Sequence, residues 1–215
     1  MRTSLWLYIL LLACGCGEQT EQKKVEQKQA APDPHSGHMK SSGGSSKYVD
    51  QVNSGEIKED TLKGSPRKIS MSNVGDVHVH ITYSSPGVKG RTIWGGLVPY
   101  DQVWVAGAHK ATSVNINGDI EVEGKTIPAG TYAFFAIPGK TYWVLILNKN
   151  YEQHLTDDYD AAQDVVRIKV KPQAVALTPR LIYAVEELSS NKGLINLQWE
   201  KIKVSLPFTI HHSTK

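Results

Sequence analysis

Apolar and polar residues alternate in short segments from Gly64 almost to the end of the chain. In Val77–Tyr83, for example, every second side chain is apolar, and turns rich in Gly, Pro and Asn separate such segments from one another. A period of two is typical of strands that bury one face. Many short strands without alternating helices predict a mainly β single domain, an antiparallel β-sandwich or jelly-roll-like fold over residues 64–208. The expected strands are Lys68–Ser72, Val77–Tyr83, Ser113–Asn117, Ile120–Val122, Tyr132–Ile137, Tyr142–Leu147, Val165–Val170, Leu181–Glu187, Leu194–Trp199 and Ile202–Ser205.

The segment before the strands has a different composition. Residues 18–46 are polar and contain almost no large apolar side chains, so folding there cannot bury enough surface to offset the entropy of ordering. We therefore expect a disordered N-terminal linker. Residues 47–63 contain few apolar residues and predict at most one or two weakly ordered helical turns, and residues 209–215 predict a tail. Within the domain, only the acidic stretch Asp157–Asp164 suggests a helix.

The first residues have the pattern of an export signal. Arg2 precedes the apolar run Leu5–Leu12, which is too short to cross a hydrocarbon core of about 30 Å. Residues 1–13 are therefore predicted to be a signal peptide. The run Leu11–Cys14 resembles a bacterial lipobox, and by that resemblance Cys14 is the lipidated first residue of the mature chain.

A lipid on Cys14 would hold the protein on a membrane without a spanning helix, with residues 14–63 as anchor and linker. This predicts a protein of the cell envelope, attached to the outer membrane on its periplasmic or surface face. The alternative is a plain secretory signal in which Cys14 and Cys16 are incidental; Cys16 is the poorer candidate for lipidation. The sequence has only these two cysteines, so the folded part has no thiol for a disulfide, a nucleophile or a Cys-based zinc site.

Length and charge narrow the classes of function. The chain has 215 residues, and 24 Lys and Arg against 21 Asp and Glu give a net charge of +3. That charge is spread thinly, without the basic concentration of a nucleic-acid-binding protein, so nucleic acid is not an expected partner. The sequence also lacks the nucleophile-elbow, zinc-protease, phosphate-loop and dinucleotide-binding motifs. It therefore favours a non-enzymatic role.

Residues 83–112 combine aromatic and basic side chains on a stretch that is rich in Gly and Pro. Long irregular segments in compact domains often carry function, and aromatic residues beside Arg are typical of binding surfaces. We interpret this segment as the binding face for a small ligand or an envelope partner. The alternative is that its aromatic side chains fill the core at one end of the sandwich and that Arg91 pairs with a carboxylate. The candidate ligand-binding residues are Lys89, Arg91, Trp94, Tyr100, Trp104 and His109.

The same segment, YSSPGVKGRTIWGGLVPYDQVWVAGAHKAT, resembles a bacterial family named only domain of unknown function 2911. Later blocks such as IPAGTYAFFAIPG and DYDAAQDVVRIKVKP are similar to that family too, so the resemblance covers roughly residues 64–208. It implies an exported, largely β domain that often occurs in lipoproteins, without an established activity. Many members have GANEAT where this chain has GAHKAT, so His109 and Lys110 replace an amide and an acid.

Two histidines on one expected strand suggest metal binding. Residues i and i+2 of a strand face the same side, so His78 and His80 are expected about 7 Å apart. Paired imidazoles with a third ligand, for which His109 is the first candidate and His154 the second, can hold zinc or copper. The alternative is that both lie on the solvent face without a metal. A second set of candidate copper ligands lies in the linker sequence HSGHM: His35, His38 and Met39. A copper- or zinc-binding periplasmic protein is therefore the alternative function.

Overall fold

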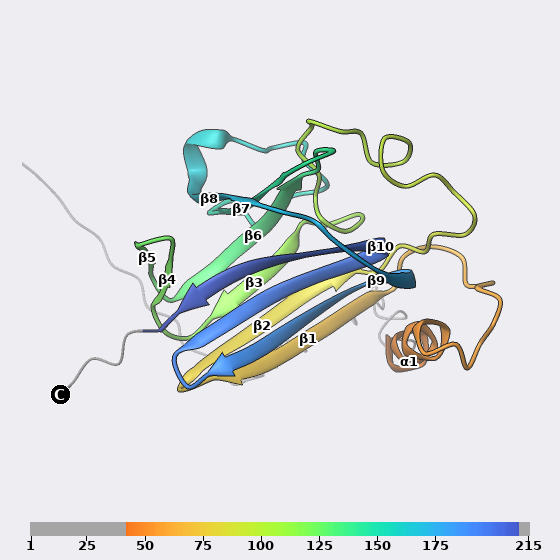
Figure 1. Ribbon diagram of the computed structural model, residues 1–215, viewed down its shortest axis with the longest axis horizontal. Coiled ribbons are helices and arrows are strands. Elements are labelled where there is room, and N and C mark those ends of the chain that lie inside the picture. The colour runs from red at the N-terminus through yellow and green to blue at the C-terminus, as the bar shows by residue number, and fades with distance from the viewer. Residues whose placement is uncertain (1–41, 211–215) are drawn as a thin grey trace, which may run out of the picture. The chain divides into compact units, whose positions relative to one another are not determined.

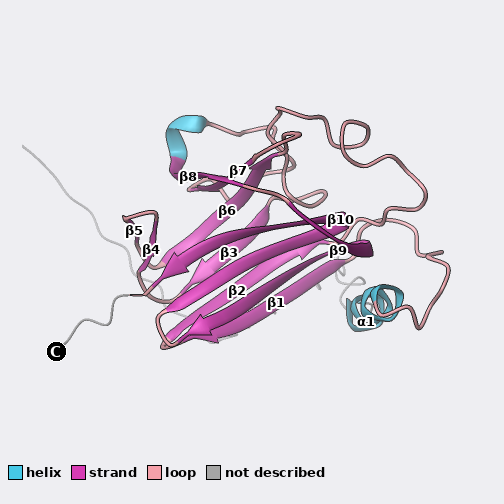
Figure 2. Cartoon of the chain, in the orientation of Figure 1, coloured by secondary structure: helices cyan, strands magenta, loops and turns pink. Residues whose placement is uncertain are grey.

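The computed structural model describes residues 42–210, which form one α-helix, one short 3-10 helix and two antiparallel β-sheets (Figure 1; Figure 2). Cys14 and the linker residues His35, His38 and Met39 lie outside this range. The larger sheet has the strand order β1-β2-β3-β6-β7-β8, and the smaller has the order β5-β4-β10-β9. The strands are β1 (Arg67–Val74), β2 (Val77–Ser84), β3 (Thr112–Ile116), β4 (Ile120–Val122), β5 (Lys125–Ile127), β6 (Gly130–Ile137), β7 (Trp143–Asn148), β8 (Asp164–Val170), β9 (Gln173–Ser189) and β10 (Lys192–Thr209).

The larger sheet begins with a tight hairpin. β1 and β2 pair in antiparallel register, with Val74 opposite Val77, and Gly75 in the turn has a φ of 54°, in the left-handed region that glycine adopts readily. Along β2, buried positions alternate with partly exposed ones, as the sequence pattern predicts. The partly exposed residues of β2 therefore share the outer face of the sheet: His78, His80, Thr82 and Ser84.

The smaller sheet contains a strand that the sequence pattern divides in two. Leu194–Trp199 and Ile202–Ser205 belong to a single strand, β10, with shifts in its register against β9 on both sides of Glu200. Glu200 has a φ of 55°, so the backbone bulges there. A bulge interrupts the alternation of apolar and polar residues by which a strand is recognised in a sequence. The sequence pattern therefore predicts a turn at Glu200 between two separate strands.

The two sheets enclose the main hydrophobic core. Figure 1 shows β9 and β10 lying across β1, β2 and β3, and the buried side chains of both sheets belong to one cluster. Val79 and Ile81 of β2 contribute to it from the larger sheet, and Ile195 and Leu197 of β10 from the smaller. The prediction of a mainly β fold with antiparallel sheets is confirmed.

The acidic stretch before β8 contains a single turn of 3-10 helix, η1 (Ala161–Gln163). The carboxylate of Asp160 caps it by accepting a hydrogen bond of 2.9 Å from the backbone N–H of Ala162. The helix expected over Asp157–Asp164 is thus reduced to a capped turn between β7 and β8.

The folded unit begins earlier than residue 64, where the sequence pattern places its start. Helix α1 (Ser42–Asn53) contacts β1 and β9, and its Val49 and Val52 are buried (Figure 1). Two apolar residues three positions apart lie on one face of a helix, but they make only a narrow apolar stripe in a polar segment. The order of this segment therefore comes from its contacts with the sandwich. Neither helix within residues 42–210 is long and apolar enough to cross a membrane.

Candidate functional site

The two tryptophans of the aromatic and basic segment pack into a cluster of four indoles. The ring of Trp94 lies 4.7 Å from that of Trp143 on β7 and 5.7 Å from that of Trp199 on β10, in edge-to-face geometry. Trp104 stacks on Trp199 at 5.8 Å. Trp143 and Trp199 are fully buried, and Trp94 and Trp104 are partly buried against the same core. These aromatic side chains are therefore part of the core packing between the sheets.

Two of the three cations of that segment, Lys89 and Arg91, bond to backbone carbonyls. Lys89 Nζ donates to the carbonyl of Leu62. Arg91 Nη2 donates to the carbonyl of Gly87, and its Nε donates to that of Val88 at 3.2 Å. The alternative interpretation pairs Arg91 with a carboxylate, but no carboxylate among the described residues forms an ion pair with it.

Tyr100 is half-buried and lies close to Gly95, where a Cβ atom would come within 2.7 Å of the tyrosine ring. The structure thus does not gather the predicted ligand-binding residues on one open face. Trp94 and Trp104 are in the core. Lys89 and Arg91 line a small pocket of about 250 Å³. Of the six, only His109 lines the larger pocket of about 640 Å³.

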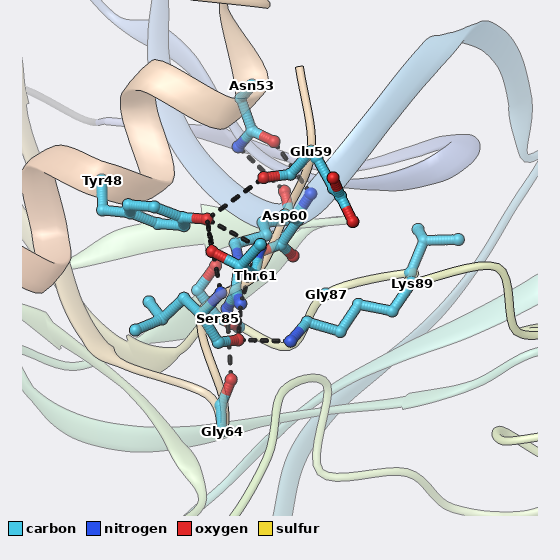
Figure 3. A network of polar contacts seen from close by, with 12 residues as sticks. Tyr48, Asn53, Glu59, Asp60, Thr61, Gly64, Ser85, Gly87 and Lys89 are labelled. Atoms are coloured by element: carbon cyan, nitrogen blue, oxygen red, sulfur yellow. Dashed lines mark hydrogen bonds and ion pairs between the residues drawn. The ribbon is translucent and has the colours of Figure 1, made fainter. Parts of the chain in front are cut away.

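A buried arginine that no sequence motif marks, Arg180, shares the carbonyl of Leu62 with Lys89. Arg180 on β9 is 0% exposed, and its Nη2 donates to Asp60 Oδ1 at 2.8 Å and to the carbonyl of Leu62 at 2.5 Å. Its Nη1 donates to the carbonyls of Ser85 and Gly64 at 3.0 and 3.2 Å. Figure 3 shows this network around Asp60, Gly64 and Ser85. Its partners are groups of the protein itself, so we assign it a structural role.

Of the three histidines expected to share a metal, two lie together and His109 lies apart from them. His78 and His80 lie side by side on the outer face of β2, with ring centroids 6.4 Å apart. His109 lies in the loop before β3 and lines a pocket to which neither of them contributes. Within residues 42–210 no group of three or more His, Cys, Asp or Glu side chains is placed to hold a metal ion.

A pocket of about 640 Å³ lies over one end of β1, β2 and β3, under the loop between β7 and β8. The outward side chains of Thr82, Ser84 and Ser113 line it from the sheet. None of these three hydroxyl groups has a hydrogen-bond partner in the described part of the chain. The remaining lining residues are Arg67, Tyr83, His109, Lys110, Ala111, Tyr151, Glu152, Gln153, His154 and Asp158.

Two loops meet at the edge of this pocket through backbone hydrogen bonds. The N–H of Leu155 donates to the carbonyl of His109 at 2.6 Å, and the N–H of Ala111 donates to the carbonyl of Gln153 at 3.0 Å. His109 and Leu155 both have left-handed backbones, with φ of 62° and 49°. Such a backbone costs a non-glycine residue of the order of 1 kcal/mol, and this kind of strain is concentrated at functional sites.

The pocket also has several polar groups without partners in the folded unit. Arg67 and Lys110 have no ion pair there, and neither do Glu152 and Asp158. The buried side chain of Gln153 also has an unpartnered acceptor, Oε1. A polar group that is buried without a hydrogen-bond partner costs free energy, so a ligand that supplies the partner is favoured. The unpartnered groups of this pocket are therefore available to a polar ligand.

His154 adds an imidazole to the pocket wall. His154 Nδ1 lies 3.0 Å from Asp157 Oδ2, and both groups are exposed, so the pair orients the imidazole without contributing much stability. Tyr83 lines the pocket as well, but its ring lies in the core against that of Tyr183, and this burial raises its pKa to about 12.

Most of this pocket could not be located from the sequence. His109 and His154 were singled out there, His154 only as a candidate metal ligand, whereas Tyr151 and Gln153 come from a loop with no recognisable motif. The available signal was the pair of polar outward residues at the end of β2, Thr82 and Ser84, on the sheet face that also carries His78 and His80.

No curated protein and no solved structure matches the chain. A family model matches residues 65–208 and hence nearly all of the sandwich. The resemblance seen in the segment around Trp94 is thereby confirmed over most of the folded unit. The chain belongs to the family described as "Protein of unknown function (DUF2911)".

Proposed function

We propose that this protein is a non-enzymatic binding protein of the cell envelope that takes a small, hydroxylated, acidic ligand in the pocket beside His109. The observation that carries the proposal is the set of three unpartnered hydroxyl groups of Thr82, Ser84 and Ser113 on one side of that pocket. A pocket of about 640 Å³ is of the size that small-molecule sites have.

The chemistry of the walls favours a sugar that carries a carboxylate or a phosphate. Tyr151 is 38% exposed at the pocket, and its ring can pack against the C–H face of a sugar. The hydroxyls of the sheet can exchange hydrogen bonds with those of the ligand. Arg67 and Lys110 can donate charge-assisted hydrogen bonds to its acidic group, while Glu152 and Asp158 can accept from its hydroxyls.

Ligand-observed NMR on the full chain tests this proposal with glucuronate, glucose 6-phosphate and glucose as probes. Both acidic sugars should show saturation transfer, and glucose should bind more weakly. Since a hydrogen bond to a charged group contributes roughly 1.5–3 kcal/mol, Arg67→Ala and Lys110→Ala should each weaken acidic-sugar binding by about tenfold or more. Arg91→Ala removes a cation outside the pocket and serves as the matched control.

Two results would overturn this assignment. One is that none of the three probes binds. The other is that Arg67→Ala and Arg91→Ala bind the acidic sugars equally well, since the pocket cations would then have no part in recognition.

We also propose that Cys14 carries the lipid that attaches the protein to the outer membrane. Support comes from the lipobox-like run Leu11–Cys14, and the test is metabolic labelling with a fatty acid in a bacterial host. The parent chain and Cys16→Ser should be labelled and fractionate with membranes, whereas Cys14→Ser should not be labelled. Labelling of Cys14→Ser, or an unlabelled parent chain, contradicts lipidation at Cys14.

A further inference from the structure

An exposed methionine faces the histidine pair on the outer side of the first hairpin. Met71 on β1 is directly opposite His80 on β2 in the strand register, and it is 62% exposed. Side chains of directly opposite residues on one sheet face have Cβ atoms about 5 Å apart. His78 lies two residues along β2 on the same face, so one thioether and two imidazoles share a small area of surface.

The distance between the two imidazole rings matches the distance expected for two imidazoles that bind one metal ion. Their ring centroids are 6.4 Å apart. A metal ion bound by an imidazole nitrogen at about 2 Å lies about 3 Å from the ring centroid, so two rings on opposite sides of one ion are separated by about 6 Å. Both rings are on the partly exposed side of the strand, where an ion from solvent can reach them.

One of the imidazoles is already held in the form that a metal requires. His78 Nδ1 lies 2.7 Å from Asn73 Oδ1, which as a carbonyl oxygen accepts a hydrogen bond, so the proton is on Nδ1 and the lone pair is on Nε2. The backbone N–H of His78 also donates to Asn117 Oδ1 at 2.7 Å. A hydrogen bond to the non-coordinating ring nitrogen is the usual way in which a ligating histidine is oriented.

From this arrangement we propose that His78, His80 and Met71 form a copper(I) site. Thioether sulfur is a soft ligand that selects Cu(I), and imidazole suits copper as well. Zinc, in contrast, favours four ligands from thiolates, imidazoles and carboxylates. Within residues 42–210, not even three such side chains lie close enough together to hold an ion. The third ligand is thus Met71 in place of His109, and the site is independent of the sugar pocket.

Competition with the chromophoric ligand bicinchoninate measures Cu(I) binding to the full chain. The chain is purified in mild detergent, and ascorbate keeps the copper as Cu(I). The background carries Cys14→Ser, Cys16→Ser, His35→Asn, His38→Asn and Met39→Leu, because those thiols, imidazoles and thioether also bind copper. In this background one Cu(I) per chain should be taken from bicinchoninate. Met71→Leu, His78→Asn and His80→Asn should each weaken binding by about 100-fold or more, and Asn73→Ala by about tenfold.

Matched variants distinguish this site from copper binding by other histidines and from the sugar pocket. His154→Asn removes an exposed imidazole elsewhere and should leave the Cu(I) affinity unchanged. Arg67→Ala should weaken sugar binding without any effect on copper. Thermal melting without copper should be the same for Met71→Leu and the background chain, because the Met71 side chain is mostly exposed.

X-ray absorption then identifies the ligands. A copper–sulfur shell in the background chain that is lost in Met71→Leu supports the proposal. The site does not exist if no stoichiometric Cu(I) is bound, if Met71→Leu binds as tightly as the background chain, or if Zn(II) displaces the copper with equal affinity.

Discussion

The guanidinium of Arg180 lies 2.8 Å from the carboxylate of Asp60, and the two side chains are 0% and 9% exposed. The pair joins β9 to the segment that leads from α1 to β1. The backbone of Arg180 is bonded to the same region, since Asn53 of α1 donates to its carbonyl at 3.0 Å and accepts from its N–H at 2.8 Å. The charge pair therefore explains why a polar segment with a narrow apolar stripe is ordered against the sandwich.

Removing the carboxylate should leave a buried guanidinium without its counter-charge. We expect Asp60→Ala to lower the free energy of unfolding by about 3–5 kcal/mol, as for other buried ion pairs that lose one partner. Urea unfolding of both chains measures the difference. Asp158→Ala, an exposed carboxylate in the pocket, is the control and should change stability by no more than about 0.5 kcal/mol. A similarly small effect of Asp60→Ala would show that the network does not stabilise the fold.

Trp94 should behave as a core residue. Its ring contacts three other indoles, so we expect Trp94→Ala to cost about 3 kcal/mol and to lower the melting temperature by several degrees. Arg91→Ala removes two hydrogen bonds at an exposed position and should cost about 1 kcal/mol or less. Thermal unfolding of the two variants compares them. If Trp94→Ala melts like the parent chain, the four-indole cluster is not part of the core.

The sequence predicted the strands well where one face of each is buried, because a period of two is then imposed by the core. β2 is the clearest case, with Val79 and Ile81 inward and the two histidines outward. The pattern failed where the backbone departs from regular strand geometry, as at Glu200, and where order depends on a distant partner. Nothing within residues 47–63 indicates that Arg180, more than a hundred residues later, holds them in place.

The candidate site was harder to predict for the same reason. Trp94 and Trp104 are typical of a binding surface when read alone, and only Trp143 and Trp199 from two other strands make them core residues. The face shared by His78 and His80 follows directly from strand periodicity. The position of Met71 opposite His80 depends on the register of the hairpin, which the alternation by itself does not fix.

Gly87 is a position where a side chain should disturb the charge pair. A Cβ atom there would come within 2.5 Å of Asp60 Oδ2, on a carboxylate that Arg180 holds in place. We expect Gly87→Ala to cost about 1–3 kcal/mol in urea unfolding, as overpacking does elsewhere. Gly44→Ala in α1 meets no atom within 4 Å and should be neutral or slightly stabilising, because alanine favours a helix. Equal stability of the two variants would contradict the close packing around Asp60.

Buried tyrosines make the fold sensitive to alkaline pH. Burial raises the pKa of Tyr83 from 10.0 to about 12, and it also raises that of the neighbouring Tyr183. Above pH 10 the unfolded chain loses these protons before the folded chain does, so the unfolded state is favoured as the pH rises. The contribution of Tyr83 is fully present below pH 10 and is lost towards pH 12, a change of about 3 kcal/mol.

Tyr83→Phe should therefore reduce the alkaline loss of stability, because phenylalanine cannot ionise. Between pH 10 and pH 12, the free energy of unfolding should fall less steeply in Tyr83→Phe than in the parent chain, with the remaining slope due in part to Tyr183. Urea unfolding at a series of pH values measures these slopes. Tyr151→Phe changes a tyrosine that is 38% exposed and should keep the parent slope. Indistinguishable slopes for Tyr83→Phe and Tyr151→Phe would mean that burial of Tyr83 is not what couples this fold to alkaline pH.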